Sequence, residues 1–367
     1  MQEPEVIARA ASRLRRSLRF VQRLSQHHLR ALAAARLARQ ADLALRLLVI
    51  PLIHLIGNPA LAQTLPQQLG PILAEQIQPR VIPEYELRHH LMGQIPKLPS
   101  PARAEEWAAE EKQMRQHLLT DVVFHGWPRE WVESPPRFED LGLIESGHGY
   151  ALRKLRYEIV PGFQSTALLY EPEPLTGRVP AILSVNGHVG PEGKAIEYKQ
   201  KRCINYARRG MMTLSLEWFG FGELSQRENG HDFAAHLDLV GTSALGLFYL
   251  AMRRGLDHLN QHPHADSGRL GVTGLSGGGW QTIVLSSLDE RVSVAVPVAG
   301  YGSLMSNIVH PADTSEIEED ATDFRRGQDY THLTAMRAPR PTLLIYNAED
   351  DCCFRAPFVK PDVYVAI

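Results

Sequence analysis

Five short and almost wholly apolar runs recur between residues 180 and 350, and this recurrence constrains the fold more than any other feature. The runs are PAILSVNG, MMTLSLEW, RLGVTGLS, VSVAVPVAG and PTLLIYNAED. Each has the length of a strand without the polar alternation of a half-exposed one, which is typical of parallel strands buried on both faces. Helical segments at 195–209, 239–259 and 279–288 separate them. The pattern predicts an α/β fold with a doubly wound, mostly parallel sheet, whose ligands bind beyond the carboxyl ends of its strands.

The chain before these runs predicts a hairpin and a helical wrap. KLRYEIV and STALLYEP alternate between apolar and polar residues, with Pro161 and Gly162 in the turn between them. Residues 63–150 are punctuated by prolines and contain one clear helical segment, in which Ser100 can cap and Pro101 suits the first turn. We therefore expect an N-terminal wrap over 63–150 and a sheet domain over 151–367.

Residues 1–62 form a basic N-terminal extension with a signal-like segment. Residues 1–46 carry ten arginines against three acidic residues, and a short apolar stretch ending in Ala60-Leu61-Ala62 follows. A positive flank, an apolar region and an A-x-A site are the pattern of an export signal, so we expect cleavage after Ala62 and a secreted or periplasmic protein. Because the flank is long, the true start can lie downstream of Met1. Membrane association through this segment and an extension without function are the alternatives.

Composition excludes several classes of function. The chain is 44% hydrophobic and 22% charged with a net charge of -2, which gives no electrostatic case for a nucleic-acid partner. Its three cysteines, Cys203, Cys352 and Cys353, show no metal-ligand spacing. We interpret the adjacent pair as small buried residues beside a strand end, with a vicinal disulfide as the alternative. We expect no cofactor and no metal, and the sequence does not determine the oligomeric state.

Ser276 is the strongest candidate for a chemical role. Residues 274–278 read G-L-S-G-G between a predicted strand and a predicted helix, which is the context in which G-x-S-x-G forms a nucleophile elbow. Side chains two residues either side of the serine would collide in so sharp a turn, so glycine is required there. The helix that follows adds partial positive charge where an oxyanion would develop. A glycine-rich tight turn is the alternative interpretation.

The sequence resembles the α/β-hydrolases, and within them the acetyl xylan esterase-like carbohydrate esterases. The resemblance covers roughly residues 85–360 and rests on SVNGHVGPEG, LEWFGFGE, RLGVTGLSGGGWQT and RPTLLIYNAEDDCCF. It implies that Ser276 is the nucleophile and that backbone N–H groups of His188 or Val189, together with that of Gly277, form the oxyanion hole. The imidazole of His188 is then structural. Glu217, where the family has aspartate, shapes the turn after its strand.

The resemblance also implies a catalytic acid and a histidine. Asp350 stands where the family places its carboxylate, and Asp351 is the fallback. The order in this fold is serine, acid, histidine, yet no histidine follows Asp350 in the 367 residues. The last two histidines, His310 and His332, are poorly placed for the usual geometry. Compared with the family, residues 151–367 therefore look like an α/β-hydrolase domain lacking its C-terminal end.

These observations predict a serine-dependent carboxylic ester hydrolase by lineage, acting on a small-molecule or carbohydrate ester. Ser276 would attack the ester and a histidine held by Asp350 would take its proton. The acyl group and alcohol stay open. A serine peptidase of the same fold and a non-catalytic or vestigial hydrolase are the alternatives, and the second is favoured by the missing histidine.

Overall fold

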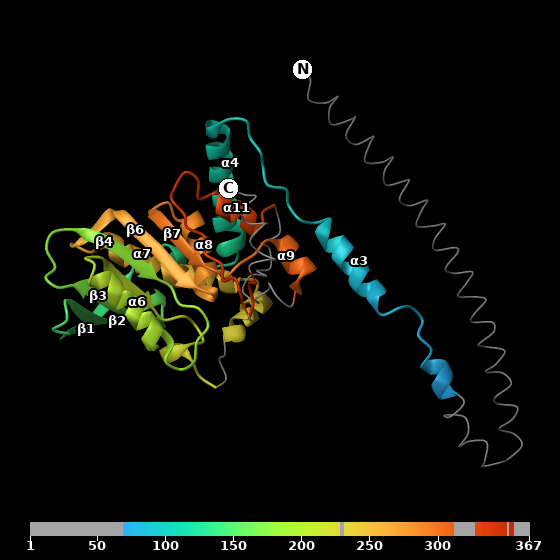
Figure 1. Ribbon diagram of the computed structural model, residues 1–367, viewed down its shortest axis with the longest axis horizontal. Helices are drawn as coiled ribbons and strands as arrows, with labels where there is room; N and C mark the ends of the chain where they lie inside the picture. The colour runs from blue at the N-terminus through green and yellow to red at the C-terminus, as the bar shows by residue number, and fades with distance from the viewer. Residues whose placement is uncertain (1–68, 228–230, 312–326, 351, 356–367) are drawn as a thin grey trace, which may run out of the picture. The chain divides into compact units, whose positions relative to one another are not determined.

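The computed structural model describes residues 69–227, 231–311, 327–350 and 352–355, and the chain divides into two compact units, Met1–Arg80 and Val81–Ile367 (Figure 1). Of the first unit it describes residues 69–80, so the expected extension and export signal lie outside the described residues. None of the helices in the described ranges has the length and apolar character needed to cross a membrane.

The second unit is built on one seven-stranded sheet with the order β1-β2-β3-β5-β4-β6-β7. β1, β2, β3 and β5 pair antiparallel in turn, while β5, β4, β6 and β7 pair in parallel. The predicted α/β fold with a mostly parallel, doubly wound region is therefore confirmed. The strands span Arg137–Glu145 (β1), Tyr150–Val160 (β2), Phe163–Pro172 (β3), Val179–Ser184 (β4), Met212–Leu216 (β5), Ala265–Leu275 (β6) and Val292–Val298 (β7).

Two features of the sheet differ in detail from the sequence prediction. β1 was not expected, so the sheet begins within the range assigned to the wrap. The last predicted strand is an extended segment rather than a full strand, joined to β7 by parallel bridges from Thr342 to Ala295 and from Ile345 to Val298. The segment nevertheless runs in the expected direction. Residues 346–350 therefore lie at the same end of the sheet as the carboxyl ends of β6 and β7.

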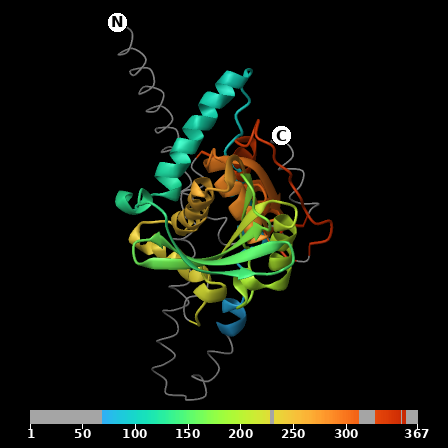
Figure 2. The same cartoon turned by 90° about the vertical axis from the view of Figure 1, so that its left-hand side faces the viewer.

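Helices cover both faces of this sheet, as Figure 2 shows from the β1 side. α7 (Ala244–Gln261) and α8 (Gly277–Leu288) pack over the main core, whereas α6 (Glu197–Ala207) covers a smaller apolar cluster around Tyr170 on the other face. The alternation along β3 explains the division, because Leu169 belongs to the first core and Tyr170 to the second. Shorter helical segments within the sheet region are η2 (Gly193–Ala195), η3 (Gly222–Leu224), η4 (His231–Val240), α9 (Leu304–Val309) and α11 (Tyr330–Ala335).

The segment before the sheet is helical, as predicted, but its main helix begins later than expected. It contains α3 (Val81–Met92), α4 (Ala104–His117), η1 (Leu118–Val123) and α5 (Arg129–Val132). Arg103, not Ser100, precedes the first turn of α4, and no side chain caps it. Glu106, in the first turn, accepts hydrogen bonds from the backbone N–H of Ala102 and from Arg103 Nε, both before the helix. Its carboxylate therefore ties the entering chain to the helix, and its charge suits the amino end.

Candidate active site

Ser276 lies in the turn between β6 and α8, as the motif predicts. Its backbone has φ 58° and ψ -128°, a conformation that non-glycine residues rarely adopt. Its N–H donates to the Val298 carbonyl at 2.9 Å, and its own carbonyl accepts from the Gly279 N–H at 2.6 Å. The strained backbone is therefore held from both sides, and Ser276 is half-buried.

The glycines around Ser276 are required by contacts with backbone. A Cβ on Gly274 would lie 2.5 Å from the Gly278 carbonyl oxygen, and one on Gly278 would lie 2.7 Å from that of Val185. A Cβ on Gly279 would lie 2.1 Å from the Ala299 carbonyl oxygen. Because backbone cannot move aside as a flexible side chain can, the expected collision two residues either side of the serine is confirmed.

The loop that follows β4 rests directly on this turn. A Cβ on Gly187 would lie 2.3 Å from the Leu275 carbonyl oxygen and 3.1 Å from the Gly277 nitrogen. This close approach brings the Gly187 backbone beside the first turn of α8. Gly277 begins that turn, and His188 and Val189, the other predicted N–H donors, follow Gly187 directly in sequence.

Three buried side chains clamp that loop. Gln281 Nε2 donates to the Asn186 carbonyl at 2.6 Å, and Lys199 Nζ donates to the Gly187 carbonyl at 3.3 Å. The Asn186 side chain in turn donates to the Leu216 carbonyl. Lys199 is 1% exposed and Gln281 is 3% exposed, so neither contact competes with bulk water. Two consecutive carbonyls of the loop are therefore fixed by side chains from α6 and α8.

Fixing the Gly187 carbonyl also fixes the next N–H group. In a trans peptide the C=O of Gly187 and the N–H of His188 belong to one plane and point in opposite directions. Lys199 thereby orients the His188 N–H without contacting it. Burial lowers the pKa of Lys199 to about 7, against the raising effect of Glu217, so proton binding at this clamp is finely balanced near neutral pH.

The side chains of His188 and Glu217 have packing roles here. The His188 ring packs edge-on against the rings of Trp218 and Phe221, with centroid separations of 5.0 and 5.3 Å. Glu217 is 2% exposed and accepts from both the backbone N–H and the Nζ of Lys194, at 2.9 and 3.0 Å. This pairing joins the turn after β5 to η2, which follows β4, so the partner of Glu217 is distant in sequence and not local as expected.

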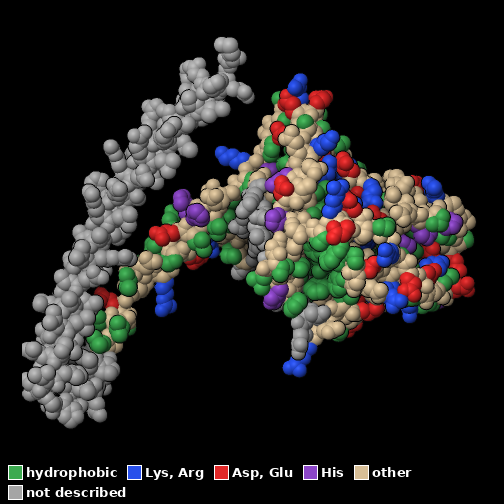
Figure 3. Space-filling model, turned by 180° about the vertical axis from the view of Figure 1, so that it is seen from behind, with side chains coloured by type: hydrophobic (Ala, Val, Ile, Leu, Met, Phe, Trp, Pro, Cys, Tyr) green, Lys and Arg blue, Asp and Glu red, His purple; other side chains and the backbone are tan. Residues whose placement is uncertain are grey.

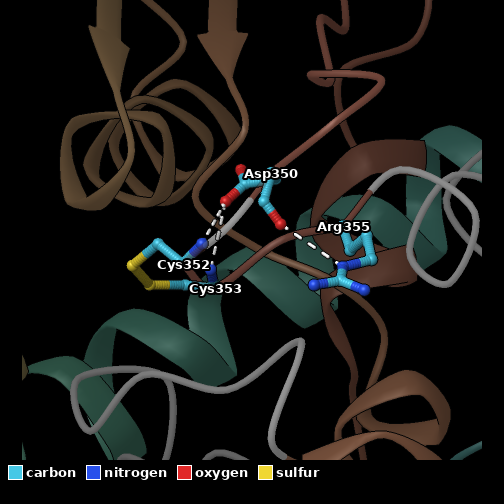
Figure 4. The surroundings of a disulfide bond; sticks show 4 residues. All are labelled: Asp350, Cys352, Cys353 and Arg355. Atoms are coloured by element: carbon cyan, nitrogen blue, oxygen red, sulfur yellow. Dashed lines mark hydrogen bonds between the residues drawn. A yellow bond between two sulfur atoms is a disulfide. The ribbon is translucent and has the colours of Figure 1, made fainter.

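Asp350 occupies a tight turn after the extended segment 342–345 (Figure 4). Its Oδ1 accepts hydrogen bonds from the backbone N–H groups of Cys352 and Cys353, at 2.9 and 3.1 Å. Within the described residues its Oδ2 accepts none, which leaves one carboxylate oxygen able to orient an imidazole. The two cysteines are joined by a disulfide, so the interpretation of this pair as unbonded residues was wrong. Asp351, the fallback acid, lies outside the described residues.

The Asp350 turn and Ser276 are linked through the end of β7. The Ala299 N–H donates to the Ile345 carbonyl, and Ala299 packs in a small apolar cluster with Phe354. The Ala299 carbonyl abuts the first turn of α8 at Gly279. All these residues stand at the carboxyl ends of parallel strands, so the predicted common edge for Ser276, His188 and Asp350 is confirmed as an arrangement of the backbone.

Of the last two histidines, His332 has a side chain that is fully engaged in hydrogen bonds. His332 is 1% exposed, its Nδ1 accepts from the Asp329 N–H at 3.0 Å, and its Nε2 lies 3.2 Å from the Lys97 carbonyl. Both ring nitrogens are therefore engaged, and burial lowers the pKa of His332. His310 ends α9, where its backbone N–H donates to the Ser306 carbonyl at 2.8 Å.

The comparisons with known proteins agree with this geometry. The family model of acetyl xylan esterase (AXE1) matches residues 150–338, slightly more than half of the chain. The chain belongs to the acetyl xylan esterase family. It is thus an ester-cleaving serine hydrolase by lineage, as predicted. The match contains Ser276 and the loop at His188 but ends before Asp350.

Solved structures establish the fold independently of that match. A Bacteroides fragilis protein assigned as an acetyl xylan esterase superposes with a TM-score of 0.62 at 20% identity, covering 74% of this chain and 76% of its own. Acetyl xylan esterase 1 from Thermoanaerobacterium sp. gives 0.51 at 19%, covering 76% and 88%. A glucuronoyl esterase from Solibacter usitatus gives 0.51 at 11%, covering 75% and 84%. A search among curated proteins finds no match.

Proposed function

We propose that this member of the acetyl xylan esterase family hydrolyses acyl esters of carbohydrates through an acyl-enzyme on Ser276. The Ser276 oxygen attacks the ester carbonyl and a general base takes its proton. The bond to the sugar oxygen then breaks, the base returns the proton to that leaving oxygen, and water releases the acid in a second, matching cycle. The observation that carries the proposal is the strained serine turn with the clamped loop packed on it.

The chain's own residues supply most of this machinery. The N–H of Gly277 and that of His188 or Val189 would stabilise the tetrahedral oxygen, and because Lys199 and Gln281 fix the loop in advance, little reorganisation is needed. Asp350 would orient the base through Oδ2. Among the described residues, His332 uses both ring nitrogens elsewhere, so it is not placed to act as the base. The engagement of His332 keeps a non-catalytic protein as the second candidate.

An assay with added imidazole as an external base distinguishes an esterase from a non-catalytic protein. Purified chain and a Ser276→Ala control would be assayed with and without added imidazole on p-nitrophenyl acetate, an acetylated xylo-oligosaccharide and a peptide p-nitroanilide. We expect a Ser276-dependent rate on both esters that rises with imidazole, and none on the anilide, whose amine must be protonated to leave. Cleavage of the anilide would indicate a peptidase. Rates equal to those of Ser276→Ala on every substrate, with imidazole present, would support the non-catalytic candidate.

A further inference from the structure

The turn that holds Asp350 contains a disulfide between two consecutive residues. Cys352 and Cys353 are bonded to each other, and their backbone N–H groups are the two donors to Asp350 Oδ1, at 2.9 and 3.1 Å. Figure 4 shows the bond beside both hydrogen bonds. The groups that hold the predicted acid thus belong to the two residues that the disulfide joins, and nothing in the proposed reaction uses the sulfur atoms.

The disulfide restricts the backbone that makes these contacts. A bond between neighbouring cysteines closes a small ring that contains the peptide bond between them. Rotation about the Cα–C bond of Cys352 is limited by that ring. Because peptide groups are planar, this bond and the N–Cα bond of the same residue set the angle between the two N–H groups. Both N–H groups donate to one oxygen, so the ring limits the geometry on which the Asp350 contacts depend.

The other contacts of the turn do not involve sulfur. Phe354 is 1% exposed and packs with Ala299 at the end of β7. Arg355 Nε donates to the Asp350 carbonyl at 3.3 Å. These contacts remain available when the disulfide is opened. We therefore expect reduction to loosen the hydrogen bonds at Asp350 Oδ1 without unfolding the turn.

The disulfide is within reach of a small thiol. Cys352 is exposed and Cys353 is half-buried, whereas Cys203, the third cysteine, is 0% exposed and forms no disulfide. Thiol–disulfide exchange begins when a thiolate reaches a disulfide sulfur, so it is directed to residues 352–353. Acidic and basic side chains are interspersed on the face seen in Figure 3, and this face gives no electrostatic reason to name a charged reductant.

We propose that the Cys352–Cys353 bond is a redox switch that controls how firmly Asp350 is held, and that a small dithiol opens it. The effect on catalysis rests on the proposed function, in which Asp350 orients the base. One thiolate of the dithiol attacks a cysteine Sγ, which breaks the Sγ–Sγ bond and forms a mixed disulfide. The second thiol then displaces the bound cysteine. The dithiol becomes a cyclic disulfide, and the cysteines gain its two electrons and two protons as thiols.

Reduction should weaken catalysis rather than abolish it. When the two N–H groups are free to turn, Asp350 Oδ1 loses part of its hydrogen bonding, and the carboxylate holds a base less firmly through Oδ2. With imidazole as the added base, the imidazole concentration that gives half the maximal rate should rise. We expect a rise of about three- to tenfold, the cost of about one hydrogen bond. The rate at saturating imidazole should change less.

The test compares oxidised chain, chain reduced with dithiothreitol and then desalted under nitrogen, and the reduced chain after reoxidation. The first measurement is amide hydrogen exchange by NMR, in which the amides of Cys352 and Cys353 should exchange at least about tenfold faster after reduction. The second is imidazole-supported hydrolysis of p-nitrophenyl acetate. Each rate is corrected with Ser276→Ala in the same redox state, because thiols also attack this ester. Reoxidation should restore both values.

Three variants serve as controls. The double variant Cys352→Ser/Cys353→Ser cannot form the bond, so it should match the reduced parent chain with or without dithiothreitol. Asp350→Ala should need more imidazole in both redox states and show no difference between them. Cys203→Ala changes the cysteine outside the turn and should keep the full response.

Unchanged exchange of the two amides after reduction would overturn the switch, whatever the activity. An equal imidazole dependence in the oxidised and reduced chain, with Ser276-dependent hydrolysis present, would also overturn it. The absence of Ser276-dependent hydrolysis in every redox state would instead contradict the proposed function. The amide exchange would then still decide whether the bond controls the Asp350 contacts, so the two proposals fail separately.

Discussion

Replacing Lys199 with methionine should reduce catalysis without reducing stability. Lys199→Met keeps the length of the side chain but removes the donor to the Gly187 carbonyl. A hydrogen bond from a charged donor contributes about 1.5–3 kcal/mol, and each 1.4 kcal/mol is a factor of ten, so kcat should fall about 10- to 100-fold. This is less than the roughly 100- to 1,000-fold cost of losing an oxyanion donor, because Gln281 still holds the neighbouring carbonyl.

Stability should respond in the opposite direction. Lys199 is 1% exposed, and replacing a buried charge with an apolar side chain of similar volume is often neutral or stabilising. The folded pKa of about 7 lies below the ordinary value of 10.5, so the folded state binds the proton less tightly than the unfolded state. The contribution of Lys199 to stability is therefore greatest above pH 10.5 and declines as the pH falls to about 7. Lys199→Met should thus gain most, relative to the parent chain, below pH 7.

The assay is imidazole-supported hydrolysis of p-nitrophenyl acetate, corrected with Ser276→Ala, beside thermal unfolding from pH 6 to 9. Lys201→Met is the matched control, since Lys201 is an exposed lysine on the same helix. The ratio of parent to Lys199→Met rates should be largest below pH about 7, where Lys199 is charged, and KM should change little. A Lys199→Met rate within about twofold of the parent, or an activity loss that merely follows a loss of stability, would refute the clamp.

Three further predictions concern the loop after β4, His332 and the N-terminal segment. Gly187→Ala places a Cβ 2.3 Å from the Leu275 carbonyl oxygen, so Ser276-dependent hydrolysis should be abolished and stability should fall by about 1–3 kcal/mol, measured by urea unfolding. His332→Ala should cost about 1–3 kcal/mol through two lost buried hydrogen bonds yet keep a Ser276-dependent rate at low temperature. Because the folded pKa of His332 is lowered, its stabilising contribution declines as pH falls below about 6.5, and the variant should lose that part of the acid sensitivity. We also propose export, so chain made in a secreting host should begin at Gln63 by mass spectrometry, and an intact Met1 terminus would contradict this.

The serine turn could be predicted from sequence because it requires glycines at fixed positions near one serine. Gly274 is required by a contact within the turn, and Gly278 and Gly279 are required by contacts with the chain after β4 and β7. A fixed spacing of glycines around one serine therefore indicates the geometry of the turn. The apolar runs predicted the parallel sheet in the same way, since a strand buried on both faces must be apolar throughout.

The clamp could not be predicted in this way. Lys199 lies on the first turn of α6, where its neighbours in sequence are polar, and its partner is a backbone carbonyl in the loop after β4. Nothing in the sequence around a lysine distinguishes a buried donor from a solvated one. The sequence gives a weak indication of a role for Gln281 near the site, because Gln281 lies in the helix that begins directly after Ser276. The start of α4 was misplaced for a related reason, since Glu106 rather than Ser100 ties the entering chain to the helix.

The Cys352–Cys353 bond shows a different limit. Adjacent cysteines permit either state, and here the bonded pair lies in a turn whose two backbone N–H groups donate to Asp350. That turn follows a segment joined to β7 by long-range bridges, which neighbouring residues in the sequence do not reveal. The sequence therefore identified Asp350 as a candidate acid but not the bonded pair beside it.

The central claim is that Ser276 carries the acyl group. The direct measurement is to mix the chain with p-nitrophenyl acetate and imidazole, quench with acid, and analyse peptides by mass spectrometry beside the Ser276→Ala variant. We predict an acetyl group on Ser276, and we expect every other labelled peptide to be labelled equally in the variant. The acetyl group should leave Ser276 slowly, because deacylation needs the same base. Labelling that is identical in the two proteins would contradict the assignment of Ser276 as the nucleophile.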